Sequence, residues 1–151
     1  PDLGALIAWN LDIDTKRIQF INGMAANDPV STLQIWKFLI DRYPAEGGTC
    51  VFFNSRDDRP LRTRQMIELT LKDIKPDHFI VRGDKVDGTI QWLLHYSPKT
   101  NVQIIGLDVS LDDVVSLMTD LPHDTLIYAI GNQVGAGQDI LEKISKYHHH
   151  G

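Results

Sequence analysis

The sequence predicts a Rossmann-like α/β fold, an open and mostly parallel sheet of about six strands with helices on both faces. Short apolar runs alternate with helical patterns along the chain, and this alternation is typical of parallel sheets with crossover helices. Several of the runs are apolar at nearly every position, as expected of strands buried on both faces. The 151 residues are 42% apolar and 23% charged, which is enough for one domain with a hydrophobic core.

Apolar runs define the predicted strands, and apolar stripes with helical spacing define the helices between them. The strands are expected at residues 5–9, 17–23, 49–54, 78–81, 102–107 and 126–130. The helical stripes are Leu33, Trp36 and Ile40; Ile67, Leu71 and Ile74; Ile90, Leu93 and Leu94; and Ile140, Leu141 and Ile144. Ser110, three residues before Asp113, resembles a capping box for a further helix that runs to Thr119. We interpret Trp36 and Trp92 as packing residues of the core or of a domain interface.

Charge and composition exclude several classes of protein. The net charge of −5 argues against a general nucleic-acid surface, which would be basic, although a local basic cluster could bind a small anion. Cys50 is the only cysteine, so an internal disulfide is excluded, and its apolar neighbours indicate a buried, unreactive thiol. No signal peptide is visible and no apolar run approaches the roughly 20 residues that cross a bilayer, so we expect a soluble chain. Residues 148–151 are interpreted as a tail or tag remnant, which leaves residues 1–147 as one domain.

Three polar segments follow predicted strands, at the sheet edge where open parallel sheets bind their ligands. The first, residues 22–32, also opens a helix. Asp28 or Ser31 can cap that helix, and the free N–H groups of a helix N-terminus favour an anion. A plain N-cap without a ligand is the competing interpretation.

The second segment, residues 54–64, holds four arginines within nine residues of an otherwise acidic protein. Guanidinium groups bind carboxylates and phosphates through two parallel hydrogen bonds, and Asp57 and Asp58 could orient them. The alternative is a solvated charged loop. In a helix after Pro60, Arg62 and Arg64 would lie about 200° apart, so both cannot hold one carboxylate. We expect Arg64 to be solvated or paired with Glu68.

The third segment, residues 131–137, is rich in glycine, and small residues allow a backbone to approach a ligand or another domain closely. Familiar catalytic motifs are missing. The chain has no G-x-x-x-x-G-K-[ST] phosphate loop, no G-x-G-x-x-G fingerprint and no G-x-S-x-G elbow. Cys50 and the scattered His78, His95 and His123 lack the spacing of metal ligands. We therefore expect no catalytic residue and no metal ligand within this chain alone.

Together the three segments resemble the C-terminal part of the poly-γ-glutamate synthase subunits of the CapB/PgsB family, which is similar to the Mur ligases. The pattern N-G-x-A-A-N-D-x-x-S-T-L-x-I-W-K matches residues 22–37. The pattern N-C-R-x-D-R-x-x-R-T-x-Q matches residues 54–65, with Ser55 in place of the cysteine. The pattern I-Y-G-x-G-N-x-x-G-A matches residues 127–136, with Ala129 in place of the first glycine. Val134 stands where relatives often carry histidine, and residues 83–88 depart from the family stretch.

The resemblance implies a domain of a bacterial amide ligase of capsule synthesis that uses ATP and Mg²⁺. In Mur-type ligases ATP phosphorylates a carboxylate, an amine attacks the acyl phosphate, and an amide forms. The product of this family is a chain of γ-linked glutamate. The C-terminal domain closes over the site, whereas the phosphate loop belongs to an ATPase domain that we expect upstream of Pro1. The isolated chain should therefore be inactive.

Site residues follow from the matched motifs and from the strand-end positions. Substrate-binding residues are expected to be Asn54, Arg56, Asp58, Arg59 and Arg62. The side chains expected to face the nucleotide or the acyl phosphate are Asn22, Asn27, Asp28, Ser31 and Thr32. Gly131, Asn132 and Gly135 are expected to form a loop of close approach.

The resemblance also implies partners and a location. The expected partners are glutamate or poly-γ-glutamate, the upstream ATPase domain and membrane subunits of a synthase complex, with no nucleic acid. The full protein would then lie at the cytoplasmic side of the membrane, attached through its other parts or partners. The alternatives are a stand-alone module that binds an anion or small ligand, and a docking domain, both without catalysis. A receiver-like signalling domain fits poorly, because an acidic pair should follow its first strand and Asn22 and Gly23 stand there.

Overall fold

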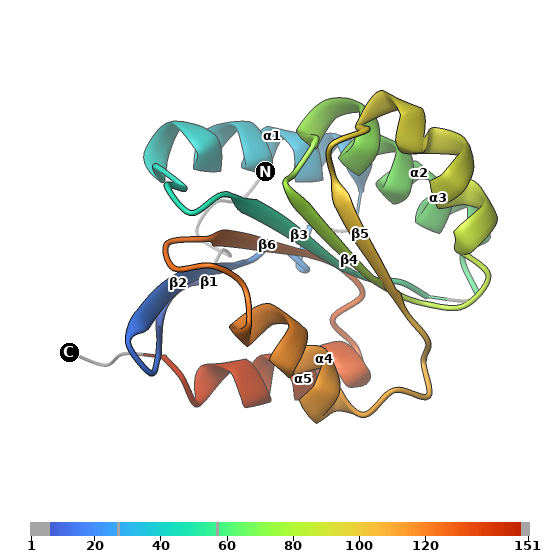
Figure 1. Ribbon diagram of the computed structural model, residues 1–151. Coiled ribbons are helices and arrows are strands. Elements are labelled where there is room, and N and C mark those ends of the chain that lie inside the picture. The colour runs from blue at the N-terminus through green and yellow to red at the C-terminus, as the bar shows by residue number, and fades with distance from the viewer. Residues whose placement is uncertain (1–6, 27, 57, 149–151) are drawn as a thin grey trace.

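The computed structural model describes residues 7–26, 28–56 and 58–148, which form one α/β domain of three layers (Figure 1). A six-stranded sheet in the order β1-β2-β6-β3-β4-β5 lies between two layers of helices. The strands are β1 (Ile7–Ile13), β2 (Lys16–Asn22), β3 (Thr49–Asn54), β4 (His78–Arg82), β5 (Asn101–Ile105) and β6 (Leu126–Gly131). All neighbouring pairs are parallel except β1 and β2. The predicted fold class is therefore confirmed.

The helices cover both faces of the sheet. They are α1 (Pro29–Arg42), α2 (Pro60–Leu69) with the π turn η2 (Thr70–Ile74), α3 (Asp87–Leu93) with the 3-10 turn η3 (Leu94–Tyr96), α4 (Leu111–Thr119) and α5 (Ala136–Ser145). In Figure 1, α1, α2 and α3 lie above the sheet, and α4 and α5 lie below it. Among the described residues, no helix is both long enough and apolar enough to span a membrane.

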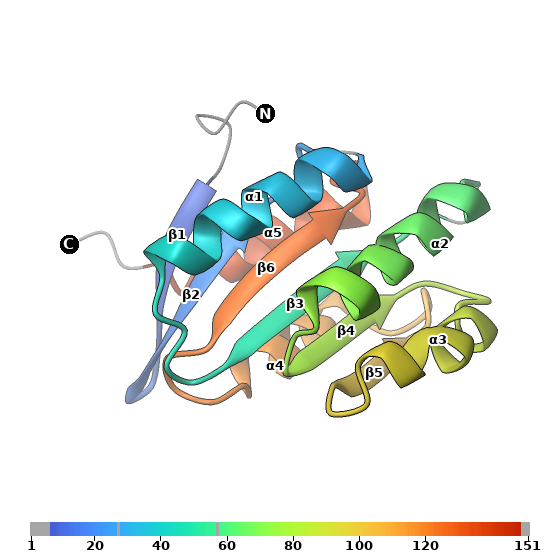
Figure 2. The ribbon, with the colours of Figure 1, turned by 90° about the horizontal axis from the view of Figure 1, so that it is seen from above.

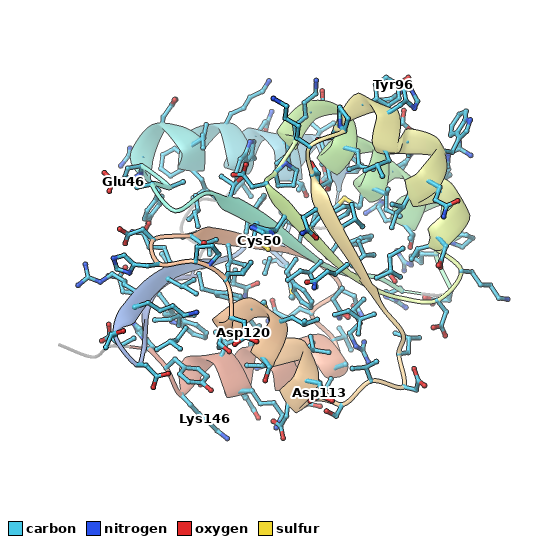
Figure 3. The ribbon with its side chains drawn as sticks, in the orientation of Figure 1. Glu46, Cys50, Tyr96, Asp113, Asp120 and Lys146 are labelled. Atoms are coloured by element: carbon cyan, nitrogen blue, oxygen red, sulfur yellow. The ribbon has the colours of Figure 1, made fainter. Side chains whose placement is uncertain are left out.

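The central strand β3 shows why the sheet is buried on both faces. Val51 and Phe53 pack into the core beneath α1, α2 and α3, whereas Cys50 and Phe52 pack toward α4 and α5. Alternate residues of a strand point to opposite faces, so an unbroken apolar run supplies both cores at once. Cys50 lies at the centre of the molecule (Figure 3), and its complete burial raises the pKa of the thiol well above the ordinary range. The prediction of a buried thiol is confirmed.

The first strand differs from its prediction. It was expected at residues 5–9 but runs from Ile7 to Ile13, and residues 5 and 6 lie outside the described part of the chain. It pairs antiparallel with β2 through a tight turn at Asp14 and Thr15, where Asp14 has a φ of 54°. Leu11 and Ile13 are buried, while Asn10 and Asp12, which alternate with them, are exposed. Such alternation is typical of an edge strand with one face exposed to solvent. A strand of this kind has no continuous apolar run, so it is not found by searching for such runs.

Two helical predictions on the upper layer need correction. In α1 the buried residues are Thr32, Ile35, Trp36 and Leu39, whereas Ile40, assigned to the buried stripe, is 43% exposed. Trp36 does pack in the core, where its ring stacks on Tyr128 at a centroid distance of 5.8 Å. Trp92 is 62% exposed and is not a core residue. The predicted buried faces of η2 and α5 are confirmed, and Ser110 caps α4 by accepting a hydrogen bond from Asp113 N.

His148 packs against the domain. It forms an isolated antiparallel bridge with Leu11, and its ring stacks on Trp9 at a centroid distance of 5.4 Å. The remaining residues of the predicted tail lie outside the described part of the chain, so the boundary at residue 147 stays a prediction.

Candidate ligand-binding site

The three polar segments predicted from the sequence converge at one edge of the sheet. Asn54, the last residue of β3, lies in register with Arg82 at the end of β4 and with Gly131 at the end of β6. Asn22 ends β2, which is the other neighbour of β6. Figure 2 shows these strands side by side, with α1, α2 and α5 beginning beyond their carboxyl ends. Parallel strands thus bring together segments that are far apart in the sequence.

A cavity of about 610 Å³ opens at this edge, and we name it the arginine cavity. Its lining residues come from the ends of β2, β3 and β6 and from the starts of α2 and α5. They are Met24, Ala25, Phe53, Asn54, Arg56, Arg59, Arg62, Thr63, Met66, Gly131, Asn132, Gln133, Val134, Gly135 and Gln138. Among these described residues, three are arginines and none is acidic. In a protein with a net charge of −5, this is a local basic site suited to an anion.

The arginines reach the cavity from one segment. Arg59 stands at the N-cap of α2, and Arg62 follows in its first turn. Arg56 is held by Asp58, because its Nε donates to Oδ1 at 3.0 Å and its Nη2 donates to Oδ2 at 2.8 Å. These bonds hold the pKa of the Asp58 carboxyl below its ordinary value. The expectation that Asp58 orients an arginine is confirmed, whereas Asp57 lies outside the described residues.

Arg64 lies away from the arginine cavity, as the helical spacing predicted. It lines a second cavity of about 360 Å³ beside Lys85 and Thr89, and its guanidinium lies 5.0 Å from the centre of the exposed Trp92 ring. The alternative partner Glu68 instead accepts a hydrogen bond from Lys72 Nζ at 2.6 Å. Arg64 is exposed, so the solvated alternative of the prediction is confirmed, and the hydrogen-bond partner of Glu68 is Lys72.

Most polar side chains of the segment between β2 and α1 form hydrogen bonds with other residues of the chain. Asn22 is 3% exposed, its Oδ1 accepts a hydrogen bond from Met24 N, and its Nδ2 donates to Gln133 Oε1. Thr32 is completely buried and donates to Ala26 O, so its side chain cannot face a ligand in this structure. That part of the prediction is wrong because the first turn of α1 packs against β6, where Tyr128 donates to Thr32 O at 2.9 Å.

Asp28 caps α1. Its Oδ1 accepts a hydrogen bond from Ser31 N at 2.8 Å, and this bond, helped to a smaller extent by the Arg62 guanidinium, lowers the pKa of the Asp28 carboxyl. Ser31 is half-buried beside it, and Asn27 lies outside the described residues. The N-cap interpretation of this segment is confirmed, and a ligand there stays a prediction.

The glycine-rich segment makes its close approach within the chain. Gly131 has a φ of 101°, and a Cβ at this position would collide with the carbonyl oxygen of Asn54 and with the Phe53 ring. Gly135 has a φ of 72° at the start of α5 and has open space around it. Glycine is thus needed at Gly131 for both conformation and space, but at Gly135 for conformation alone. Gly131 thus allows β6 to approach β3 closely, and the approach of this segment to a ligand or another domain stays a prediction.

Arg82 is a feature of this edge that the sequence reading missed, because the predicted strand ended at Val81. Its guanidinium is buried, donating from Nη1 to Asn54 Oδ1 at 3.0 Å and from Nη2 to Leu107 O at 3.3 Å. Ser55 Oγ donates to the backbone carbonyl of Arg82 at 2.9 Å. The only sign of this role in the sequence is that a charged residue, Arg82, directly follows the apolar residues of the predicted strand.

Residues 9–147 match the family described as the poly-gamma-glutamate synthase CapB C-terminal domain. The chain belongs to this family. The match spans all three polar segments and every strand end at the arginine cavity. The resemblance drawn from the motifs is therefore confirmed.

Two curated relatives are also CapB proteins. The chain is 31% identical over 149 residues to "PGA synthase CapB" of Bacillus subtilis (strain 168), a match that covers 97% of this chain and 37% of that protein. It is 30% identical over 145 residues to "Capsule biosynthesis protein CapB" of Bacillus anthracis, covering 95% of this chain and 31% of that protein. The chain thus spans about a third of the length of these relatives.

A solved structure supports the fold. MurF from Acinetobacter baumannii is similar with a TM-score of 0.52 at 15% identity, over 83% of this chain and 28% of that chain. This likeness shows a shared fold between the CapB C-terminal domain and one part of a Mur protein.

Proposed function

We propose that this chain is the substrate-binding, closing domain of an ATP-dependent amide ligase that joins glutamate through γ-amide bonds. Membership of the CapB C-terminal family supports the reaction class. The observation that carries the proposal for this chain is the arginine cavity, which gathers Arg56, Arg59 and Arg62 with no acidic residue among its described lining residues. Glutamate and its polymer are anionic at neutral pH, so this charge pattern matches the substrate.

In the proposed reaction, ATP phosphorylates a carboxylate, the amine of the next glutamate attacks the acyl phosphate, and phosphate leaves as the amide forms. The part of this chain is to hold carboxylates through the fork-shaped donors of its arginines. Asp58 fixes Arg56 before the ligand arrives, which reduces the conformational entropy lost on binding. The remaining partners we propose are an ATPase domain in the same protein and membrane subunits of a synthase complex.

The start of α1 is proposed to face the nucleotide or acyl phosphate when the domain closes. The candidates are Asn27, Asp28 and Ser31, with Asn22 acting through the backbone turn that it holds. Among the described residues, no group of three or more His, Cys, Asp and Glu side chains could hold a metal ion. We propose that Mg²⁺ is held with the nucleotide elsewhere in the longer protein, as the resemblance to the Mur ligases implies. Unchanged turnover and ATP affinity in a full-length Asn27→Ala protein would contradict this assignment.

Glutamate saturation kinetics on full-length Arg59→Ala and Arg64→Ala proteins test the main proposal. Arg59 lines the arginine cavity and Arg64 does not, although both belong to the same segment. Arg59 and Arg64 are both exposed in this structure, and we propose that bound glutamate and the closed domain remove only Arg59 from water. Losing a desolvated charged contact costs about 2–5 kcal/mol, so the KM for glutamate should rise roughly 30-fold or more in Arg59→Ala. Arg64 stays solvated and contributes about 0–1 kcal/mol, so Arg64→Ala should be close to wild type. Equal and small changes of this KM in the two variants would indicate that the arginines form a solvated loop, and would favour the alternative of a docking domain.

A further inference from the structure

Arg82 is a buried cation without an anion. It is 8% exposed, and its side-chain N–H groups donate to two neutral oxygens, Asn54 Oδ1 and Leu107 O. Its Nε has no hydrogen-bond partner, and no carboxylate among the described residues forms an ion pair with it. Buried charges in proteins are normally paired, because an uncompensated charge costs several kcal/mol. A guanidinium N–H without an acceptor, at the ligand edge of a parallel sheet, indicates a place where an oxyanion can bind.

A cavity borders Arg82, although the Nε atom itself is enclosed in this structure. Its volume is about 430 Å³, and it is distinct from the arginine cavity, which Arg82 does not line. The lining residues are Asn54, Ser55, Arg56, Asp58, Arg82, Leu107, Asn132, Val134 and Ala136. Asp58 is the acidic residue among them, and both of its oxygens accept hydrogen bonds from Arg56. We name this space the Arg82 cavity.

The two cavities are neighbours with a common wall. Asn54, Arg56, Asn132 and Val134 line both, and the wall between them includes the hydrogen bond from Asn54 Nδ2 to Asn132 O. Val134, which lines both cavities, is 76% exposed. A ligand with two anionic groups separated by a few bonds could therefore place one with Arg59 and Arg62 and the other with Arg82.

We propose that the Arg82 cavity is a second oxyanion subsite, so that the edge of the sheet binds a ligand with at least two anionic groups rather than a single amino acid. This inference rests on the proposed function and extends it, since a γ-linked glutamate chain carries one free carboxylate on every residue. The shared chemistry is a carboxylate or phosphate oxyanion that accepts a hydrogen bond from the Arg82 guanidinium. The carboxylate of a neighbouring residue in the chain is one source, and a phosphate group is the other.

Calorimetric titration of the 151-residue chain tests the subsite with three probes: glutamate, a trimer of γ-linked glutamate and inorganic phosphate. The variants are Arg82→Gln and Arg82→Lys, with Arg42→Gln as the control. Arg42 lies in the last turn of α1 and lines neither cavity. Wild type should bind the trimer more tightly than glutamate. Both Arg82 variants should bind the trimer at least about tenfold more weakly, because one charged contact is lost, while their affinity for glutamate is unchanged.

The Arg82 Nε–H resonance of the wild-type chain gives a readout that needs no variant, in case either substitution disturbs folding. It should shift on addition of the trimer and stay in place with glutamate. A shift caused by phosphate, with phosphate affinity lost in the Arg82 variants and trimer affinity kept, would assign the subsite to a phosphate source. An unmoved resonance with both the trimer and phosphate would overturn the proposal, as would wild-type affinities in the Arg82 variants.

The same titrations separate this proposal from the function on which it rests. Loss of trimer affinity in Arg82→Lys without any effect of Arg59→Ala would support the subsite and remove the arginine cavity from substrate binding. Loss of trimer affinity in Arg59→Ala alone would support substrate binding in the arginine cavity and would overturn the Arg82 subsite.

Discussion

Asn54 and Asn132 are joined by two hydrogen bonds that run in opposite directions. Asn54 Nδ2 donates to Asn132 O at 2.8 Å, and Asn132 N donates to Asn54 O at 2.8 Å. The ends of β3 and β6 are thereby clamped at the wall between the two cavities. Asn54 is 1% exposed and holds the segments that carry the arginines, and because it also lines both cavities its role in substrate binding stays a prediction.

Asn54→Ala should destabilise the domain by about 2–4 kcal/mol, because it removes one buried hydrogen bond and leaves Arg82 Nη1 without its acceptor. The free energy of unfolding in urea measures this change. Asn10→Ala, at an exposed position of β1, is the control and should lie within about 0.5 kcal/mol of wild type. Equal losses in the two variants would show that the clamp contributes little.

Gly131→Ala should destabilise the domain by about 2–5 kcal/mol, since a left-handed conformation and an overlap with Asn54 O act together. Gly88→Ala is the matched control. A Cβ at Gly88 meets nothing within 4 Å, and the residue lies in α3, so alanine should stabilise the helix by about 0.5–1 kcal/mol. Thermal unfolding should show a lower melting temperature for Gly131→Ala and a higher one for Gly88→Ala. A Gly131→Ala protein as stable as wild type would contradict the steric account.

Asp28 should make the stability of the domain fall in acid. Its pKa is lower in the folded protein than in the unfolded chain, so its contribution is fully present above the ordinary aspartate pKa and is lost as the pH falls through the lowered value. Asp28→Asn keeps the cap and should remove this part of the pH dependence. Asp28→Ala should cost about 0.5–2 kcal/mol at neutral pH. Urea unfolding between pH 7 and acid is the measurement, and parallel pH profiles for wild type and Asp28→Asn would refute the assignment.

The isolated 151-residue chain should neither hydrolyse ATP nor form amide bonds, because its sequence has no phosphate loop. Phosphate release and glutamate incorporation are the assays, with the full-length protein as the positive control. Turnover of ATP by the purified chain, abolished by Arg59→Ala, would contradict the assignment of this chain as a closing domain.

The fold class, the order of the parallel strands along the chain and the segments that meet at the ligand edge could all be predicted from the sequence. These features depend on local patterns: an apolar run such as β3 is typical of a strand buried on both faces, and residues that end parallel strands share one edge. The separation of Arg62 from Arg64 followed in the same way from the helical period.

Which polar side chains are exposed to a ligand depends on the tertiary structure. Asn54 and Thr32 look like ligand residues in the sequence, yet both are buried, and they are bonded to Asn132 and Tyr128, which are about 80 to 100 residues away in the chain. Arg82 looks like a solvated strand end, yet it is buried without an anion because the segments after β3 and β5 close over it. Burial and pairing depend on contacts between distant segments, and no local pattern of residues records them.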